Sequence, residues 1–307
     1  MTESTTFADI GTPGQPWNEA DRARWRSRLV RQRRHADDVL PRIERLRARW
    51  DIEQYGTLDA DGETFPLLAL RSREADATLP IALVTGGVHG YETSGVQGAL
   101  DFAEQHAAAY AGRVQLLVVP CVSPWGYERV QRWNRDAVDP NRSFRTPSPA
   151  PEAAALIAFV EPVRARVLVH MDLHETTDTD ETEFRPALAS RDGVAHVPGT
   201  IPDGFYLVGD SERPHPAFQA HVLDAVAAIT HIAPADADGT LIGTPLAAPG
   251  LIEYPVRRLG LCAGLTDAPF VTTTEVYPDS PRTTPAECDA AQVAAVRAAI
   301  DYALAQR

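Results

Sequence analysis

The sequence predicts an α/β protein: one domain on a mixed, mostly parallel, twisted sheet with helices on both faces, preceded by an N-terminal helical extension. Strand-like apolar runs alternate with helix-like patterns from residue 51 onward, which is typical of such a sheet. The 307 residues, of which 44% are hydrophobic, are enough to bury a sizeable core, in one large α/β domain or in two small ones. We expect residues 1–50 to form the extension and residues 51–307 to form the main domain.

The predicted extension is helical over residues 18–50. Asn18 can cap the first helix, with Asp21 in its first turn. We expect Pro41 to divide this segment into two helices. Its apolar residues recur at roughly helical spacing: Trp25, Leu29, Val39, Leu40, Ile43, Leu46 and Trp50.

Six later runs have the composition of strands. They are TFPLLALRS (64–72), IALVTGG (81–87), RVQLLVVPCVS (113–123), RVLVHMDLHE (166–175), GFYLVGD (204–210) and FVTTTEVYP (270–278). A helix is expected over residues 98–110. The last helix should run to about Gln306, because Thr284, Pro285 and Glu287 supply an N-cap, a first-turn proline and a capping-box acid.

Charge and cysteine content exclude several classes of protein. The formal net charge of -13 disfavours nucleic acid as a partner, since phosphate binding needs a basic surface. The three cysteines are widely spaced without a CxxC pair, which argues against a disulfide framework and a cysteine-based zinc site. The first residues do not show a basic region followed by an apolar core, and no later apolar run approaches the length of a membrane span. We therefore expect a cytoplasmic protein with no membrane partner.

The stretch GGVHGYETSG, residues 86–95, carries the first candidate metal ligands. It follows a predicted strand and precedes a predicted helix, so His89 and Glu92 lie at a strand-to-helix junction. A histidine and a glutamate three residues apart are a weak signal alone. A zinc site in an enzyme needs a third ligand of nitrogen or oxygen type and an open position for water.

The run RVLVHMDLHETTD, residues 166–178, supplies that third ligand. Strand alternation places His170, Asp172 and His174 on one face, with His174 at the carboxyl end. Ligands of open α/β sheets bind outside the carboxyl ends of the strands, which favours His174. We interpret His170 as a hydrogen-bonded core residue. Asp172 or Glu175 could orient an imidazole or be an ordinary polar residue.

Residues 131–144, QRWNRDAVDPNRSF, contain three arginines and two asparagines. An arginine fork is the natural partner of a carboxylate, so this segment is a candidate binding site for an anionic group.

The order of these motifs resembles the zinc metallocarboxypeptidase superfamily of carboxypeptidase A. The elements are HxxE, Arg-x-Asn, Asp-x-Asn-Arg, a histidine that ends a strand, and a glutamate in the strand before the last helix. The resemblance covers most of residues 80–305 and implies a carboxypeptidase-like fold for residues 51–307. The interval from His89 to His174 is shorter than in the digestive enzymes and resembles the branch containing succinylglutamate desuccinylase and aspartoacylase.

The resemblance also implies roles for individual residues. It implies that one zinc ion per chain is bound by His89, Glu92 and His174, and that Asn141 and Arg142 hold a substrate carboxylate. It further implies that Glu275 is the general base. The arginine that polarises the scissile carbonyl would be Arg132, with Arg135 as second candidate. Tyr254 is a candidate for the tyrosine that caps the substrate. The usual leucine of the Asp-Leu-Asn-Arg motif is Pro140 here. Segments 183–190 and 241–255 are expected to form the pocket.

This set of residues predicts hydrolysis of an amide bond next to a free carboxylate. The leading hypothesis is a metallocarboxypeptidase that releases C-terminal residues from peptides. The alternative is a deacylase acting on a small N-acyl amino acid. A catalytically silent carboxylate-binding module is the third hypothesis, and the presence of Glu275 beside three candidate ligands disfavours it.

Overall fold

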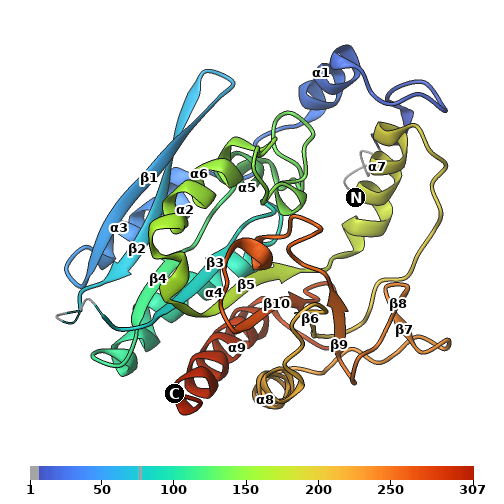
Figure 1. The fold of residues 1–307 in the computed structure, drawn as a ribbon. Helices are drawn as coiled ribbons and strands as arrows, with labels where there is room; N and C mark the ends of the chain where they lie inside the picture. Colours follow the sequence, from blue (N-terminus) through green and yellow to red (C-terminus); the bar gives the residue numbers. More distant parts are fainter. Residues whose placement is uncertain (1–6, 75, 77) are drawn as a thin grey trace.

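A computed structural model describes residues 7–74, 76 and 78–307 and confirms the predicted fold class (Figure 1). Its centre is an eight-stranded mixed sheet with strand order β1-β2-β4-β3-β5-β10-β6-β9. The strands are β1 (Trp50–Ala60), β2 (Glu63–Ser72), β3 (Ile81–Gly86), β4 (Gln115–Val119), β5 (Val167–Glu175), β6 (Tyr206–Asp210), β9 (Leu251–Tyr254) and β10 (Phe270–Val276). A separate two-stranded ribbon pairs β7 (Thr240–Leu241) with β8 (Thr244–Pro245).

The middle of the sheet is parallel, and both of its ends depart from that direction. Strands β4, β3, β5 and β10 run parallel, so their carboxyl ends meet at one edge. β1 and β2 form an antiparallel hairpin that joins β4, while β6 and β9 run antiparallel to β10. All six predicted strands are present.

Helices cover both faces of the sheet. They are α1 (Glu19–Arg28), α2 (His35–Asp38), α3 (Leu40–Leu46), α4 (Thr93–Asp101), α5 (Pro124–Arg129), α6 (Pro151–Val160), α7 (Arg185–Asp192), α8 (Pro216–Ala227) and α9 (Pro285–Ala305). Ala82 and Val84 of β3 face the core formed with α4, α8 and α9, whereas Ile81 and Leu83 face the core that contains α6. This alternation is the period of two expected of a strand that is buried on both sides.

The N-terminal segment differs from the prediction in where it breaks. Pro41 lies in the first turn of α3, where its missing N–H costs no hydrogen bond, and a helix boundary falls at Val39 just before it, between α2 and α3. A further break, which was not predicted, separates α1 from α2 at residues 29–34. Asn18 caps α1 through a capping box with Asp21, as predicted. Trp50 begins β1 rather than ending a helix, and β1 was not predicted because its side chains do not alternate regularly between buried and exposed. The division of the domain at residue 50 stays a prediction.

Two further helices bear on the predictions. α4 begins at Thr93, five residues before the predicted start, and continues beyond Asp101 as a turn of π-helix and a turn of 3-10 helix up to Tyr110. α9 has the predicted capping box, in which the side chains of Thr284 and Glu287 each bond to the other's backbone N–H. No helix among the residues described is long and apolar enough to cross a membrane.

Candidate metal centre and active-site cavity

His89, Glu92 and His174 converge at the carboxyl edge of the sheet. Nδ1 of His89 lies 2.6 Å from Oε1 of Glu92, and Nδ1 of His174 lies 2.7 Å from Oε2 of the same carboxylate. All three side chains are only 1% exposed. Oε2 of Glu92 is buried and accepts no hydrogen bond from the described residues, since its contact with His174 lacks hydrogen-bond geometry. Two imidazoles and a carboxylate whose donor atoms face one point fit the ligand set of a catalytic zinc ion.

Glycines bring these ligands close together. A Cβ atom at Gly95, in the first turn of α4, would lie 2.5 Å from the carbonyl oxygen of Leu173, so only glycine lets α4 approach β5 this closely. At Gly90, between His89 and Glu92, a Cβ atom would lie 1.9 Å from the carbonyl carbon of Gly126. The glycine-framed turn therefore holds Glu92 within reach of a histidine on the neighbouring strand.

Two carboxylates orient the imidazole rings. Asp172 Oδ2 lies 2.8 Å from Nε2 of His174, and Asp139 Oδ1 lies 3.0 Å from Nε2 of His89. With Nε2 engaged in each ring, Nδ1 is the atom that faces the centre. Glu175 does not orient an imidazole: it accepts the backbone N–H groups of Thr93 and Ser94 at 3.0 and 2.6 Å at the start of α4. Of the two acids that the sequence offered for orienting an imidazole, Asp172 and Glu175, only Asp172 contacts one.

Mutual charge stabilisation dominates the electrostatics of the centre. Burial alone would raise the pKa of Glu92, but the imidazoles of His174 and His89 lower it to about 2. Burial opposes protonation of His174, whereas Glu92 and Asp172 raise its pKa well above the usual range. The pKa of Asp139, despite its burial, is held well below the usual value by Arg132 and His89.

A cavity of about 190 Å³ adjoins the centre and brings together the other predicted residues. It is lined by residues of every predicted group: His89, Arg132, Asn141, Arg142, Tyr254 and Glu275. Arg185 and Ile242 line it too, which supports the expectation that segments 183–190 and 241–255 form the pocket. Arg135 lies elsewhere among the described residues, with its guanidinium 3.0 Å from Asp61.

Glu275, Asn141, Arg142 and Tyr254, which line this cavity, are each held by hydrogen bonds to neighbouring groups. Thr176 donates a hydrogen bond of 2.9 Å to Oε2 of Glu275, and burial raises the pKa of Glu275 to about 8. Asn141 is fixed through its Oδ1, which accepts the N–H of Cys262 at 2.7 Å. Arg142 donates to the main-chain oxygen of Asn141 at 2.7 Å, and Tyr254 shares a hydrogen bond of 2.8 Å with Thr244.

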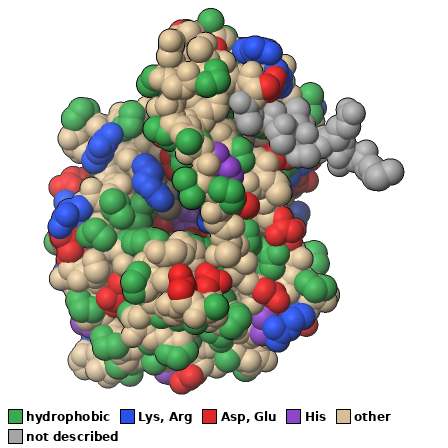
Figure 2. All heavy atoms as spheres, turned by 90° about the vertical axis from the view of Figure 1, so that its right-hand side faces the viewer, with side chains coloured by type: hydrophobic (Ala, Val, Ile, Leu, Met, Phe, Trp, Pro, Cys, Tyr) green, Lys and Arg blue, Asp and Glu red, His purple; other side chains and the backbone are tan. Residues whose placement is uncertain are grey.

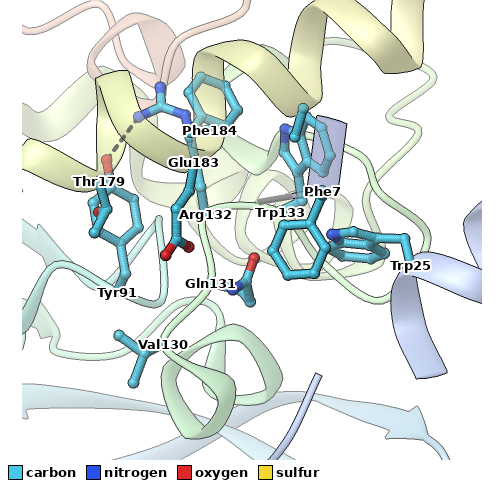
Figure 3. Close-up of a pocket in the computed structure, with 11 residues that line it drawn as sticks. Phe7, Trp25, Tyr91, Val130, Gln131, Arg132, Trp133, Thr179, Glu183 and Phe184 are labelled. Atoms are coloured by element: carbon cyan, nitrogen blue, oxygen red, sulfur yellow. Dashed lines mark hydrogen bonds between the residues drawn. The ribbon is translucent and has the colours of Figure 1, made fainter. Parts of the chain in front are cut away.

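Arg132 is held by four neighbours. Its Nε donates to Asp139 at 3.2 Å, its Nη1 donates to the Tyr91 hydroxyl at 3.0 Å, and the same nitrogen lies 3.4 Å from Asp180. Its guanidinium carbon lies 4.4 Å from the centre of the Phe184 ring. Figure 3 shows the bond to Tyr91 and, beside it, a small pocket walled by aromatic rings: Phe7, Trp25, Trp133 and Phe184. These contacts fix the guanidinium in one orientation.

Comparison with known proteins supplies the family. Residues 46–207 match the family described as "Protein of unknown function (DUF2817)". The chain belongs to this family. No curated protein matches this DUF2817 member.

The fold of this DUF2817 protein is shared with solved metallopeptidase structures. A candidate metallopeptidase from Shewanella denitrificans is 19% identical with a TM-score of 0.66, covering 87% of this chain and 90% of its own. A metallo-carboxypeptidase from Burkholderia cenocepacia is 15% identical with a TM-score of 0.56, covering 95% of this chain and 70% of its own. A Pseudomonas aeruginosa metallo-carboxypeptidase in complex with (2-guanidinoethylmercapto)succinic acid is 15% identical with a TM-score of 0.55, covering 94% of this chain and 70% of its own. At such identities the likeness shows a carboxypeptidase-like fold.

Four residues of the DUF2817 site were not identified from the sequence: Tyr91, Asp139, Asp180 and Phe184. Asp139 had a signal, because it is the first residue of the Asp-x-Asn-Arg motif that contains Asn141. Tyr91 lies between two candidate ligands, but that position does not reveal its hydrogen bond of 2.7 Å to Asp180. Asp180 and Phe184 belong to a short turn of π-helix after β5, for which no periodic pattern exists.

Proposed function

We propose that this DUF2817 protein is a zinc-dependent hydrolase that cleaves an amide bond next to a free carboxylate, and that it acts as a metallocarboxypeptidase on peptides. One observation carries the proposal: the His89–Glu92–His174 centre opens into the same cavity as Glu275, Arg132 and Arg142. A ligand set, a base, an oxyanion partner and a carboxylate partner in one cavity form the minimum set of groups for this reaction.

Zinc at this centre would supply Lewis acidity, which makes water acidic enough to lose a proton near neutral pH and polarises a carbonyl group. In its ionised form, the carboxylate of Glu275 accepts the proton of the attacking water and returns it to the leaving nitrogen. The guanidinium of Arg132 stabilises the negative charge that develops on the carbonyl oxygen. Asn141 and Arg142 bind the substrate carboxylate, so the scissile bond is oriented by the end of the chain.

The carboxypeptidase hypothesis is favoured over the alternatives by one observation. The similar structures include metallo-carboxypeptidases, whose coverage of this chain extends over nearly its whole length. The cavity of about 190 Å³ suits either a single terminal residue or a small N-acyl amino acid, so its volume does not separate these two hypotheses. The deacylase alternative is supported by the short interval between His89 and His174. The silent-module hypothesis is disfavoured because Glu275 lines the same cavity as His89, which is grouped with the other two candidate ligands, Glu92 and His174.

Metal content and turnover test the proposal together. Mass spectrometry should find about one zinc ion per wild-type chain. We expect that ion to be lost in His89→Ala and retained in a control variant at the exposed His221, His221→Ala. Short peptides and N-acyl amino acids, assayed in parallel, then separate a carboxypeptidase from a deacylase. Absence of bound metal after zinc loading would contradict the proposal.

A further inference from the structure

A second cavity, about 460 Å³ in volume, adjoins the active-site cavity. The two share Arg132, Arg142 and Phe184, so these residues form the wall between them. Five arginines line the second cavity: Arg22, Arg132, Arg142, Arg145 and Arg191. Only two carboxylates, Asp139 and Asp192, line it with them. We call these five residues and the space between them the arginine groove.

In the described structure, three of the five arginines of the groove are not neutralised by a carboxylate, whereas Arg132 pairs with Asp139 and Asp180, and Arg191 pairs with Asp192. Within the described part of the chain, Arg22, Arg142 and Arg145 form no ion pair, whereas most arginines elsewhere pair with a carboxylate. Arg22 donates to the main-chain oxygen of Asp136 at 2.6 Å, and Arg142 likewise donates to a main-chain oxygen. Carbonyl groups hold such side chains in place without cancelling their charge.

The local charge contrasts with that of the whole chain, which is -13. A uniformly acidic surface would repel an anion, but a concave site lined by one sign of charge concentrates counter-charged groups. Figure 2 shows arginine side chains gathered on one side of the hollow in this face of the molecule. The arginine groove is therefore a local concentration of positive charge on an acidic chain.

Separate segments of the chain build the arginine groove. Arg22 comes from α1, which Trp25 anchors in a buried aromatic cluster. Arg145 follows the Asp-x-Asn-Arg motif, and Arg191 comes from α7, where it lies 4.7 Å above the ring of Trp133. The N–H of Trp17 bonds to the carbonyl of Arg191 at 2.8 Å and ties the N-terminal segment to α7 (Figure 1). The N-terminal helices thus contribute to the site.

We infer that the arginine groove binds carboxylate-bearing residues on the amino-terminal side of the scissile bond, so that the preferred substrates are acidic peptides. This inference rests on the proposed function. When the cavity of Glu275 takes the terminal residue, the rest of the peptide leaves past Arg132, and the arginine groove begins there. Arginine suits this task because its fork pairs with carboxylates in a bidentate manner.

The test compares two peptides that end in the same residue and differ only upstream, where one carries two glutamates and the other two glutamines. We expect wild type to cleave the acidic peptide with a kcat/KM about tenfold higher, the order expected when two exposed charge pairs form. This ratio should fall as ionic strength rises. In the double variant Arg22→Gln/Arg145→Gln the ratio of the two kcat/KM values should be close to one. Lysine at both positions should restore much of the preference for the acidic peptide. The control Arg113→Gln/Arg297→Gln, which removes two arginines that form no ion pair in the described structure, should leave it unchanged.

A binding measurement separates failure of this inference from failure of the proposed function. Fluorescence anisotropy with a labelled tetraglutamate needs no turnover. We expect tetraglutamate to bind wild type in a salt-dependent manner, with an affinity about tenfold lower in Arg22→Gln/Arg145→Gln. This result would support binding of carboxylates by the arginine groove even if no peptide were cleaved. A ratio near one in wild type, or equal tetraglutamate affinity in the variant and the control, would overturn the inference. Thermal melting checks that both double variants are folded.

Discussion

Glu275 and His174 are register partners on the adjacent parallel strands β10 and β5. Partners in a parallel ladder project on the same side of the sheet, so the candidate base and a candidate metal ligand leave the same edge together. Their separation is set by main-chain hydrogen bonds rather than by a loop. A change of the Glu275 side chain should consequently alter the chemistry without altering the architecture of the centre.

The first prediction follows from that rigidity. Glu275→Gln should lower kcat by roughly 10²-fold or more, because the amide cannot accept the proton of the attacking water. Metal content and KM should stay near their wild-type values, since Glu275 is not among the candidate ligands. Steady-state kinetics measures kcat and KM, and mass spectrometry measures the metal content. Wild-type turnover in this variant would remove Glu275 from the mechanism.

Two nearby arginines allow a matched test of the oxyanion partner. Arg132→Gln should lower kcat by about 10²- to 10³-fold, as loss of one preorganised donor does. Arg135→Gln, which breaks partly exposed ion pairs with Asp61 and Asp136, should remain within about twofold of wild type. Comparable losses in the two variants would contradict the assignment of Arg132.

Tyr91 should act as a positioning residue for Arg132. Tyr91→Phe removes a hydroxyl that accepts from Arg132 and donates to Asp180. We expect kcat to fall about tenfold, less than in Arg132→Gln, because Asp139 and Asp180 still hold the guanidinium. In an Arg132→Gln background the same change should have little further effect, and a fully additive loss in the double variant would count against the coupling.

The parts of the site that could be predicted are those that depend on local pattern. His89 and Glu92 are three residues apart, and strand alternation placed His174 at a carboxyl end, so the ligands converge as expected. Arg132 was preferred to Arg135 only through its place in the Arg-x-Asn motif, because which of the two reaches the cavity depends on where the chain turns between positions three residues apart. Asp180 was beyond prediction for the same reason, since only the fold brings it to Tyr91.

The fold shows the same division between local and long-range information. Buried strands such as β3 were predicted because every residue is apolar or small and the run ends in glycine. The edge strand β1 was missed because its pattern of exposure is irregular, so pairing with β2 rather than burial defines it. The arginine groove likewise could not be predicted from the sequence, because its five arginines come from separate segments of the chain that only the fold brings together.

Recognition of the substrate carboxylate can be tested from both partners. Arg142→Gln should lower kcat/KM for a peptide with a free C-terminus by roughly 10²-fold, the effect of losing a charge-assisted hydrogen bond. Wild type should lose a comparable factor when the peptide is C-terminally amidated. The two losses should not add, because each removes the same pair. Additive losses would show that Arg142 binds another part of the substrate.

The last prediction concerns stability and a group outside the site, Glu152 of α6. It is fully buried, its Oε1 has no hydrogen-bond partner in the described structure, and Asn134 reaches its Oε2 only at 3.5 Å. Burial raises the pKa of Glu152 to about 7 from 4.5. Below about pH 4.5 both the folded and the unfolded chain carry this proton, and between that pH and about 7 only the folded chain keeps it. The free energy of unfolding should therefore fall by up to about 3 kcal/mol through this window and stay flat above it.

Glu152→Gln removes the titrating proton while keeping the shape of the side chain. The difference in the free energy of unfolding between variant and wild type should shift in favour of the variant as pH rises from about 5 to about 8, because only wild type loses stability through this group. Other acids with a raised pKa, such as the half-buried Asp289 with a pKa of about 7, titrate equally in both proteins and cancel in the difference. Urea unfolding at several pH values measures it. A difference that does not change with pH would mean that Glu152 is already ionised in the folded protein and that the α6 core accommodates its charge.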